Sequence, residues 1–297
     1  MTWISSLKSF GYRERFSIES VFKSHPHACL LIISSSMDTD RGSYLLKPFK
    51  DQGFKVTAIS PDFEYIFRST SAEAWFDGLK KGNVDPGEVP LGQNLSNLLR
   101  LAVLYKYGGI YLDTDVIVLK SFKSLRNVIG AQTMDVQTGN WSRLNNAVMI
   151  FDKNHPLLFK FIEDFAISFN GNKWGHNGPY LVSRVVSRVT DRPGFNFTVL
   201  PPLAFYPVGW NRIQSLFHGP IDAVHLRWLT AKLKHIRENS FGVHLWNKQS
   251  RRLKVEKGSI LNRIMWDCCV FCRCSSSVSA LQVLQKERGV KNHRDLC

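Results

Sequence analysis

Hydrophobic and polar positions form alternating blocks through the first two hundred residues of the chain. Apolar runs at 28–34 and 54–59 have the length and composition of buried strands, and 42–52 has helical spacing between them. The segment 19–23 has the pattern of the end of an earlier helix. Because a strand, a helix and a second strand follow one another, the pattern predicts parallel pairing and an α/β fold.

A longer helix and a further strand follow, with two glycines between them. Apolar residues recur at helical spacing at Leu91, Leu95, Leu98, Ala102 and Tyr105. We expect this helix to stop at Gly108 and Gly109, where the chain gains conformational freedom. The segment 110–119 is apolar apart from two aspartates, so it predicts an interior strand with two charges at one end.

The rest of the pattern divides the chain into one large domain and a tail. It predicts strands at 147–151 and 197–200 and helices at 156–169 and 179–189. Prolines and aromatic residues after Pro201 predict irregular structure. We therefore expect one domain over 1–265 and a polar, cysteine-rich and poorly ordered tail over 266–297.

The candidate chemistry begins with Asp113 and Asp115, two residues apart in the predicted strand. Side chains alternate along a strand, so both carboxylates are expected on one face. Two adjacent carboxylates repel each other and lose hydration, and a divalent cation offsets both costs. Oxygen ligands favour Mg²⁺ or Mn²⁺, with positions left for phosphate oxygens. The alternative is a pair of solvated acids in a turn at the end of the strand.

The two acids belong to a longer block, which reads NLSNLLRLAVLYKYGGIYLDTD at 94–115. Further blocks read LNNAVM at 144–149, GHNGP at 175–179, LPPLAFYP at 200–207 and VHLWN at 243–247. Together they resemble the α-1,4-glycosyltransferase family with a DXD sugar-binding region, which includes lactosylceramide 4-α-galactosyltransferase. The resemblance is greatest to plant-type members and covers residues 3–272.

This resemblance implies a fold and an activity. The fold would be of the GT-A type, a nucleotide-sugar-binding α/β fold with a mainly parallel central sheet, over 1–265. The activity would be the metal-dependent transfer of a hexose, with galactose as a candidate, to a glycan or glycolipid acceptor. The donor is expected to be a UDP-linked sugar and the cofactor Mn²⁺ or Mg²⁺. Anomeric configuration would be retained, and no catalytic base or nucleophile is assigned.

The resemblance also implies roles for single residues of the block. Asp115 would bind the metal directly, and Asp113 would support the metal and contact the ribose or donor sugar. Ser96, Asn97 and Arg100 lie within about one helical turn and would point together at the donor. Asn97 stands where some relatives carry Asp, and a helix-surface salt bridge is the alternative for Arg100.

Four later residues complete the predicted site. Asn146, with its neighbour Asn145, would orient donor or acceptor, and a turn at the start of a strand is the alternative. Asn177 would line the cleft, although Asn-Gly-Pro is also a good helix start. His244 would complete the metal site with Trp246 beside it on the same face of a short strand. The alternative for His244 is a neutral core residue bonded to backbone.

Composition and charge leave other classes of function open. With 297 residues and 44% hydrophobic content, the chain can bury a core, which excludes disorder as the default. The net charge is +15, and 227–263 holds ten Lys or Arg against two Glu, an excess of eight. A basic module for nucleic acid or anionic glycans is therefore one alternative, and a catalytically inactive family member is another. The sequence resembles no nucleic-acid-binding fold, so no nucleic-acid partner is expected.

Localisation and the cysteines are the remaining features of the sequence. The relatives are anchored in the Golgi through an N-terminal segment, and the resemblance implies the same compartment. No apolar run here reaches the roughly 18 residues that span a bilayer, so we expect a truncated form or one that lacks an address. Membrane association would require the missing anchor. Five of the six cysteines lie at Cys268, Cys269, Cys272, Cys274 and Cys297, where disulfides or free thiols are expected in preference to a zinc site.

Overall fold

A computed structural model describes residues 1–272 of the chain. The elements of the first half are η1 (Leu7–Ser9), α1 (Tyr12–Ser24), β1 (Cys29–Ile33), α2 (Asp40–Asp51), β2 (Lys55–Ile59), α3 (Phe63–Phe67), α4 (Ser71–Lys80), α5 (Leu91–Tyr107), β3 (Gly109–Leu112), β4 (Val116–Val118) and β5 (Val128–Met134). Those of the second half are β6 (Trp141–Phe151), α6 (Pro156–Ser168), α7 (Pro179–Val189), β7 (Thr198–Leu200), η2 (Pro202–Ala204), η3 (Trp210–Leu216), α8 (Ala223–Asn239), β8 (Gly242–His244), α9 (Asn247–Ser250) and α10 (Ile260–Cys268). Helices and strands alternate, so the predicted α/β class is confirmed.

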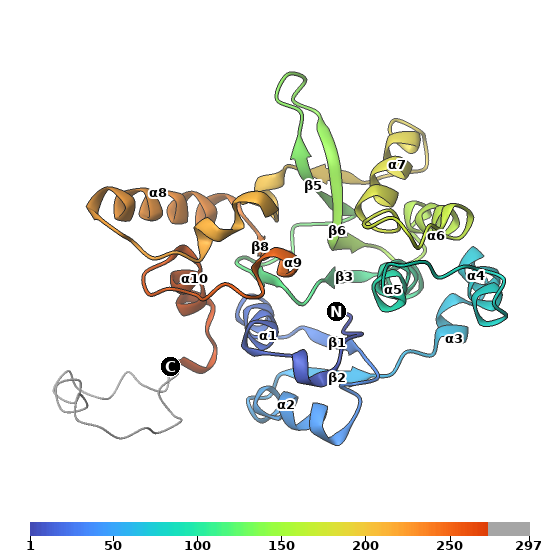
Figure 1. The fold of residues 1–297 in the computed structure, drawn as a ribbon, viewed down its shortest axis with the longest axis horizontal. Helices are drawn as coiled ribbons and strands as arrows, with labels where there is room; N and C mark the ends of the chain where they lie inside the picture. Colours follow the sequence, from blue (N-terminus) through green and yellow to red (C-terminus); the bar gives the residue numbers. More distant parts are fainter. Residues whose placement is uncertain (273–297) are drawn as a thin grey trace.

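The described strands form three small sheets (Figure 1). β1 and β2 pair in parallel, as their order in the sequence predicts. β3, β6, β5 and β7 form a four-stranded sheet in that order, in which β5 and β7 are parallel and the other two pairs are antiparallel. The expectation of a mainly parallel central sheet is corrected to a mixed one, because the long strand β6 runs antiparallel to both of its neighbours.

The predicted continuous strand over 110–119 is wrong. Its first part is β3, in which Leu112 pairs with Val148 of β6. Its last part is β4, in which Val116 pairs with His244 of β8. Since the chain leaves one sheet and joins another, the three residues between β3 and β4 form a turn. The two aspartates therefore lie in this turn, and the argument from side-chain alternation does not apply to them.

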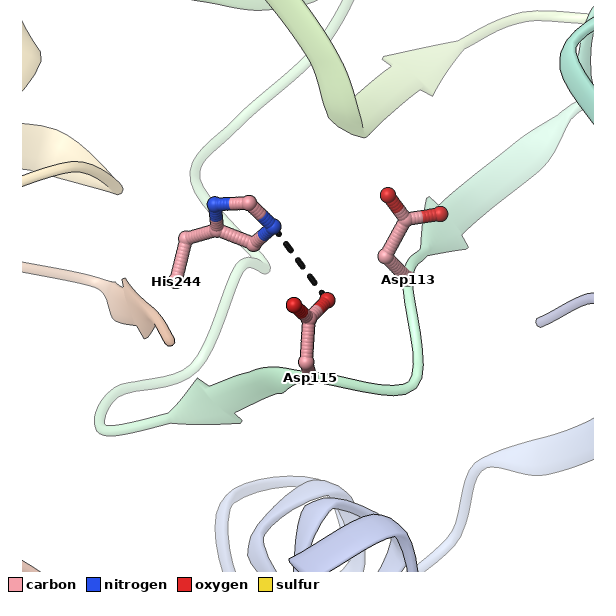
Figure 2. A group of neighbouring side chains, drawn as sticks. All are labelled: Asp113, Asp115 and His244. Carbon is pink, nitrogen blue, oxygen red and sulfur yellow. Dashed lines mark ion pairs between the residues drawn. The ribbon is translucent and has the colours of Figure 1, made fainter. Parts of the chain in front are cut away.

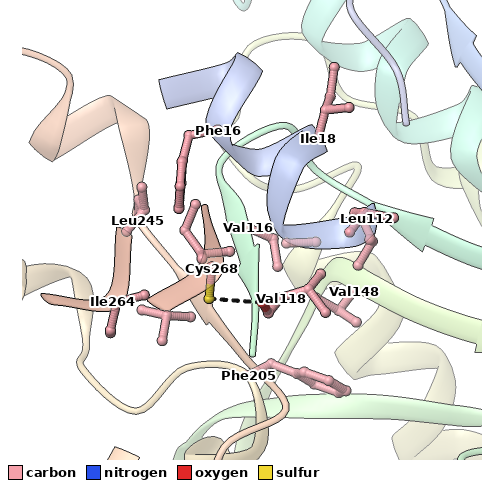
Figure 3. Close-up of a cluster of buried hydrophobic side chains, with 14 of the residues drawn as sticks. Phe16, Ile18, Leu112, Val116, Val118, Val148, Phe205, Leu245, Ile264 and Cys268 are labelled. Carbon is pink, nitrogen blue, oxygen red and sulfur yellow. Dashed lines mark hydrogen bonds between the residues drawn. The ribbon is translucent and has the colours of Figure 1, made fainter. Parts of the chain in front are cut away.

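The four-stranded sheet separates two hydrophobic cores. Tyr111 and Met149 face the core that α5, α6 and α7 cover. Leu112 and Val148, one position away on each strand, face the core formed with α1, α8 and α10. Figure 3 shows this second core around Val116 and the neighbouring strand and helix residues. The aspartate turn thus follows a strand that is packed on both faces, which holds its position firmly.

The prediction of irregular structure after Pro201 is also wrong. α8 is a helix of 17 residues that starts where the Asp222 carboxylate accepts a hydrogen bond from the backbone N–H of His225 (2.6 Å). Its buried residues recur at helical spacing, at Leu229, Leu233 and Ile236. α10 runs across the proposed boundary at 265, and the Cys268 side chain is buried against β4. Apolar spacing on these helices was the signal that the prolines obscured.

The cysteine-rich segment is described as far as residue 272. Cys269 and Cys272 form a disulfide, and the thiols of Cys29 and Cys268 are free. Cys274, Cys297 and the disorder expected of the tail lie outside the described residues. Within residues 1–272, no helix combines the length and the apolar character needed to cross a membrane.

Candidate metal and donor site

The two aspartates are fixed by backbone hydrogen bonds to neighbouring strands. The backbone N–H of Asp113 donates to the carbonyl of Ala147 at 2.8 Å, which ties the turn to β6. The carbonyl of Asp115 accepts from the backbone N–H of Leu245, also at 2.8 Å, which ties it to the segment after β8. The turn is therefore held on both sides by segments distant in the sequence.

His244 lies next to Asp115 because β4 and β8 are paired. Its Nε2 is 3.2 Å from Oδ1 of Asp115, and both side chains are buried. Figure 2 shows the imidazole and both carboxylates directed toward a common centre. One ligand atom from each of Asp113, Asp115 and His244 can be chosen so that all three lie within 4.8 Å of one another. The three predicted metal ligands are thus brought together, from a turn and a strand about 130 residues apart.

Asp115 and His244 each favour the charged form of the other. Burial alone would raise the pKa of the Asp115 carboxyl, but His244 and the backbone N–H of Asn247 (2.8 Å from Oδ2) lower it below its usual value. Burial likewise opposes the charge on His244, yet the carboxylates of Asp115 and Asp113 raise its pKa. Nδ1 of His244 is buried without a hydrogen-bond partner. The nitrogen that faces the carboxylates is Nε2, so Nε2 and the two carboxylates suit a divalent cation that would take the place of the imidazole proton between them.

Asp113 belongs to a closed ring of hydrogen bonds, which we call the Arg100 ring. Arg100 Nη2 donates to Ser96 Oγ at 3.3 Å, and Nη1 lies 3.0 Å from Asp113 Oδ1. The Tyr111 hydroxyl donates to the same oxygen at 2.7 Å. Since that proton is used, the Thr2 hydroxyl donates to Tyr111 (2.7 Å) and Ser96 in turn donates to Thr2 (2.7 Å). The ring comprises Arg100, Ser96, Thr2, Tyr111 and Asp113.

Arg100 is the buried cation of this ring. Its side chain is 3% exposed, and its guanidinium lies over the ring of Tyr111, 4.5 Å from the centroid. Burial opposes its charge, but Asp113 and Tyr111 raise the pKa of Arg100 above its usual value. It also donates to the carbonyls of Ser96 and Asn146. Arg100 is therefore a buried partner of Asp113 and not the surface salt bridge considered as the alternative. Donor contacts by Ser96 and Arg100 stay a prediction.

Two members of the ring were missed at the level of sequence. Tyr111 stands two residues before Asp113 and donates to it across the end of β3, so its nearness in the sequence was the available signal. Thr2 offered no signal, since 94 positions separate it from Ser96. β1 brings Thr2 into place through a bridge to Ile33.

Asn97 and Asn146 meet beside this ring. Asn146 Nδ2 donates to Asn97 Oδ1 at 3.1 Å, and both side chains are buried. A Cβ atom at Gly178 would come within 2.9 Å of the same oxygen, so the start of α7 packs directly on Asn97. The alternative of a turn at the start of a strand is wrong for this pair, because both asparagines lie inside β6, where Asn145 Oδ1 accepts from the backbone N–H of Ala147 at 2.8 Å. Donor contacts by Asn97 and Asn146 stay a prediction.

Asn177 and Trp246 have contacts of other kinds. Asn177 Nδ2 donates to Asn94 Oδ1 and to the carbonyl of Asn170, so its amide fixes the loop before α7. α7 begins at Pro179, as the alternative of a helix start proposed. A cleft-lining role for Asn177 stays a prediction.

Trp246 lies beside His244, but not for the predicted reason. It follows β8 with a φ of 54°, in the left-handed region, so the two residues do not share the face of one strand. The turn places the rings 4.3 Å apart, centroid to centroid, in an edge-to-face contact. Nε1 of Trp246 donates to the carbonyl of Val208 at 2.9 Å. Its donor-binding role stays a prediction.

Two hollows lie elsewhere on the described surface. One, of about 500 Å³, is lined by Trp141 and residues 190–199, and the other, of about 350 Å³, by Trp75, 83–85 and residues 166–172. Neither is lined by the three candidate ligands. We place the site at the ligands because a divalent ion requires converging charged or imidazole groups, which a hollow by itself does not provide. The segment 208–219 contains η3 and buries Ile213, Leu216 and Phe217.

Comparison with known proteins agrees with this geometry. Residues 11–135 match the glycosyltransferase sugar-binding region containing the DXD motif, and residues 150–276 match the alpha 1,4-glycosyltransferase conserved region. The chain belongs to the α-1,4-glycosyltransferase family. The match to the DXD region agrees with an α/β fold of the GT-A type, and it places both aspartates inside the matched region.

Three relatives of this α-1,4-glycosyltransferase illustrate the similarity. Human lactosylceramide 4-alpha-galactosyltransferase is 32% identical over 257 residues, which are 82% of this chain and 66% of that protein. The Arabidopsis thaliana uncharacterized protein At4g19900 is 30% identical over 92% of this chain and 42% of its own length. Human alpha-1,4-N-acetylglucosaminyltransferase is 29% identical over 52% of this chain and 43% of its own length. The chain thus spans about two thirds or less of each of these three relatives.

Proposed function

We propose that the protein transfers a hexose from a UDP-linked sugar to a glycan or glycolipid acceptor, in a reaction that depends on a divalent cation. One observation carries the proposal: Asp113, Asp115 and His244 present ligand atoms within 4.8 Å of one another. Family membership supplies the reaction class, and the cluster supplies the place where a diphosphate would be bound. The same cluster weighs against an inactive family member, since the three side chains remain directed toward one centre.

Asp113, Asp115 and His244 would hold the cation. When bound, a divalent cation neutralises the negative charge that develops on the departing diphosphate. The imidazole favours Mn²⁺, because Mg²⁺ prefers an all-oxygen octahedral shell. Arg100 and Tyr111 both contact Oδ1 of Asp113 and fix its orientation, so the site would be preorganised before the donor arrives.

The transfer exchanges one C–O bond for another. The bond between the anomeric carbon and the β-phosphate oxygen breaks, and UDP leaves with the electron pair. The acceptor hydroxyl oxygen bonds to the anomeric carbon and releases its proton with the leaving diphosphate. Attack on the face from which UDP departs retains the configuration, which is what family membership suggests. No protein group is assigned as nucleophile or base.

Galactose is the donor sugar that we propose, and lactose-containing glycolipids are the acceptors. The name of the human relative motivates both. The second human relative is named for N-acetylglucosamine, so UDP-N-acetylglucosamine is the donor to compare. Golgi localisation is proposed from family membership.

Donor hydrolysis tests the proposal without knowledge of the acceptor. UDP-galactose, UDP-N-acetylglucosamine and UDP-glucose are incubated with the protein and Mn²⁺, and free UDP is measured. We expect release from one of them that stops when EDTA is added. The matched control is the double substitution Asp113→Asn, Asp115→Asn. Calorimetry that shows no Mn²⁺-dependent UDP binding by the unaltered protein would exclude the proposed function.

A further inference from the structure

Two half-exposed aromatic side chains flank the start of α7. Trp174 is 51% exposed and Tyr180 is 48% exposed. Each carries a cation on its ring: Lys248 Nζ lies 3.5 Å from the centroid of Trp174, and Arg143 Cζ lies 3.7 Å from the centroid of Tyr180. We call these four residues the aromatic rim.

The loop that carries Trp174 is anchored at both ends. A Cβ atom at Gly171 would come within 1.9 Å of the carbonyl oxygen of Pro86, so the backbones are in direct contact there. At the other end, Asn177 bonds to Asn94 of α5. Exposure of the indole is therefore built into an ordered loop. Keeping that much apolar area in water on a fixed loop costs hydrophobic free energy, which a bound ligand would recover.

One side of the aromatic rim adjoins the metal site. Lys248 directly follows Asn247, and the backbone N–H of Asn247 donates to Asp115 Oδ2 at 2.8 Å. The side chain of Lys248 thus reaches from the position next to Asn247, which is bonded to the candidate metal ligand Asp115, to the ring of Trp174. Such a position suits the group that receives the sugar, outside the diphosphate.

The other side adjoins the asparagine pair. Gly178, two residues before Tyr180, packs against Asn97. Arg143 is on β6, three residues before Asn146, and Asn146 is bonded to Asn97. The rim is therefore connected to the proposed donor site from two independent elements.

We infer that the aromatic rim is the acceptor subsite and that it binds a neutral hexose ring. This inference rests on the proposed function of the same site. A hexose presents C–H groups of partial positive charge on one face, which are complementary to the negative face of an aromatic ring. Lys248 and Arg143 cover one face of each ring, so the sugar would stack on the other face of Trp174 and Tyr180, whose side chains remain about half exposed. The two cations would hold the rings in place for this stacking.

Ligand-observed NMR tests this assignment with lactose as the probe, in the presence of UDP and Mn²⁺. We expect saturation transfer from the protein to the C–H protons of lactose. Trp174→Ala and Tyr180→Ala should each weaken lactose binding about tenfold, the order expected for loss of one stacking ring. Trp174→Phe should retain most of it. The matched controls are Trp266→Ala and Tyr44→Ala, which remove exposed rings (67% and 75%) on α10 and α2 and should change nothing.

A second experiment distinguishes binding of the sugar ring from binding of lipid or detergent. Lactosylceramide in detergent micelles replaces lactose, and equal loss in both arms assigns the rim to the sugar ring. Loss in the micelle arm alone would assign the rim to lipid or detergent and overturn the inference. No saturation transfer to lactose by the unaltered protein, or an unchanged signal in Trp174→Ala, would also overturn it. UDP binding with Mn²⁺, measured on the same samples by calorimetry, shows separately whether the proposed donor function holds.

Discussion

The two aspartates of the turn are neutralised in different ways. Asp113 lies in the Arg100 ring, where a buried guanidinium and a phenol hydroxyl hold it at 3.0 and 2.7 Å. Asp115 lies against His244, whose charge depends on one proton. A guanidinium keeps its charge at any ordinary pH, whereas an imidazole can release its proton. An entering cation could thus displace the proton of His244 but not the charge of Arg100.

The two carboxylates therefore differ in the role that we expect of them. The Asp113 side is a fixed scaffold with 27% of the carboxylate side chain exposed. The Asp115 side is where charge is exchanged, because its counter-charge can leave as a proton when the cation binds. Substitutions on the two sides should therefore separate loss of metal binding from loss of stability.

The largest effect is expected from Asp115→Asn. It removes a direct ligand, so the affinity for UDP in the presence of Mn²⁺ should fall by about a hundredfold or more. The melting temperature should change little, because His244 can then stay neutral and the new amide oxygen can still accept from Asn247. Calorimetry and thermal denaturation measure the two quantities. Unchanged affinity would remove Asp115 from the metal site.

Asp113→Asn should reduce stability as well as binding. It leaves the buried Arg100 without its carboxylate, at a cost of about 3 kcal/mol, the lower end for breaking a buried pair. For a domain of this size that corresponds to a fall of roughly 6 to 12 °C in melting temperature. If mutual repulsion of the two aspartates were the larger effect, the Asp113→Asn variant would instead keep its stability.

A second substitution checks the cause of that loss. Adding Arg100→Met to Asp113→Asn replaces the orphaned charge with an apolar side chain of similar length and should restore most of the melting temperature. UDP binding should not return. If the single Asp113→Asn variant melts like the unaltered protein, the Arg100 ring is not the stabilising unit described here.

His244→Ala should act on metal binding by a smaller factor. The concentration of Mn²⁺ needed for half-maximal UDP binding should rise about tenfold. In EDTA the variant should also melt at a lower temperature, since Asp115 loses its counter-charge, and saturating Mn²⁺ should remove that difference. Melting that is lower in both conditions, with the Mn²⁺ requirement unchanged, would make His244 a structural residue.

The smallest effect concerns pH in the absence of metal. The pKa of His244 is raised in the folded protein, so the pair contributes fully below the ordinary histidine value of 6.5 and the contribution is lost as pH rises through the folded value. The pKa of Asp115 is lowered, so the contribution is also lost as pH falls through its folded value, below the ordinary 3.8. Thermal denaturation in EDTA should show stability falling above about pH 6.5, and less so in His244→Ala. Identical pH profiles for the unaltered protein and His244→Ala would mean that the charges of Asp115 and His244 do not stabilise each other.

The sequence was sufficient for the fold class and for the residues that meet at the metal site. Helical spacing identified α5, and the DXD block identified both aspartates and, by resemblance, His244. It was insufficient for the path of the chain at 110–119. The residues there that pair with β6 and those that pair with β8 are both apolar, so together they have the pattern of one continuous strand. The Arg100 ring was also beyond reach, since Thr2 joins it through space and has no local pattern.

The pairing of β4 with β8 has a consequence for biosynthesis. Val116 and His244 face each other in register, so the proposed nucleotide-sugar site is not assembled until the segment 242–247 has been translated and has docked on β4. A nascent chain that ends before this point carries both aspartates and yet has no complete binding centre. Gain of UDP affinity during synthesis would therefore report that β8 has reached its place, more than 120 residues after the aspartates leave the ribosome.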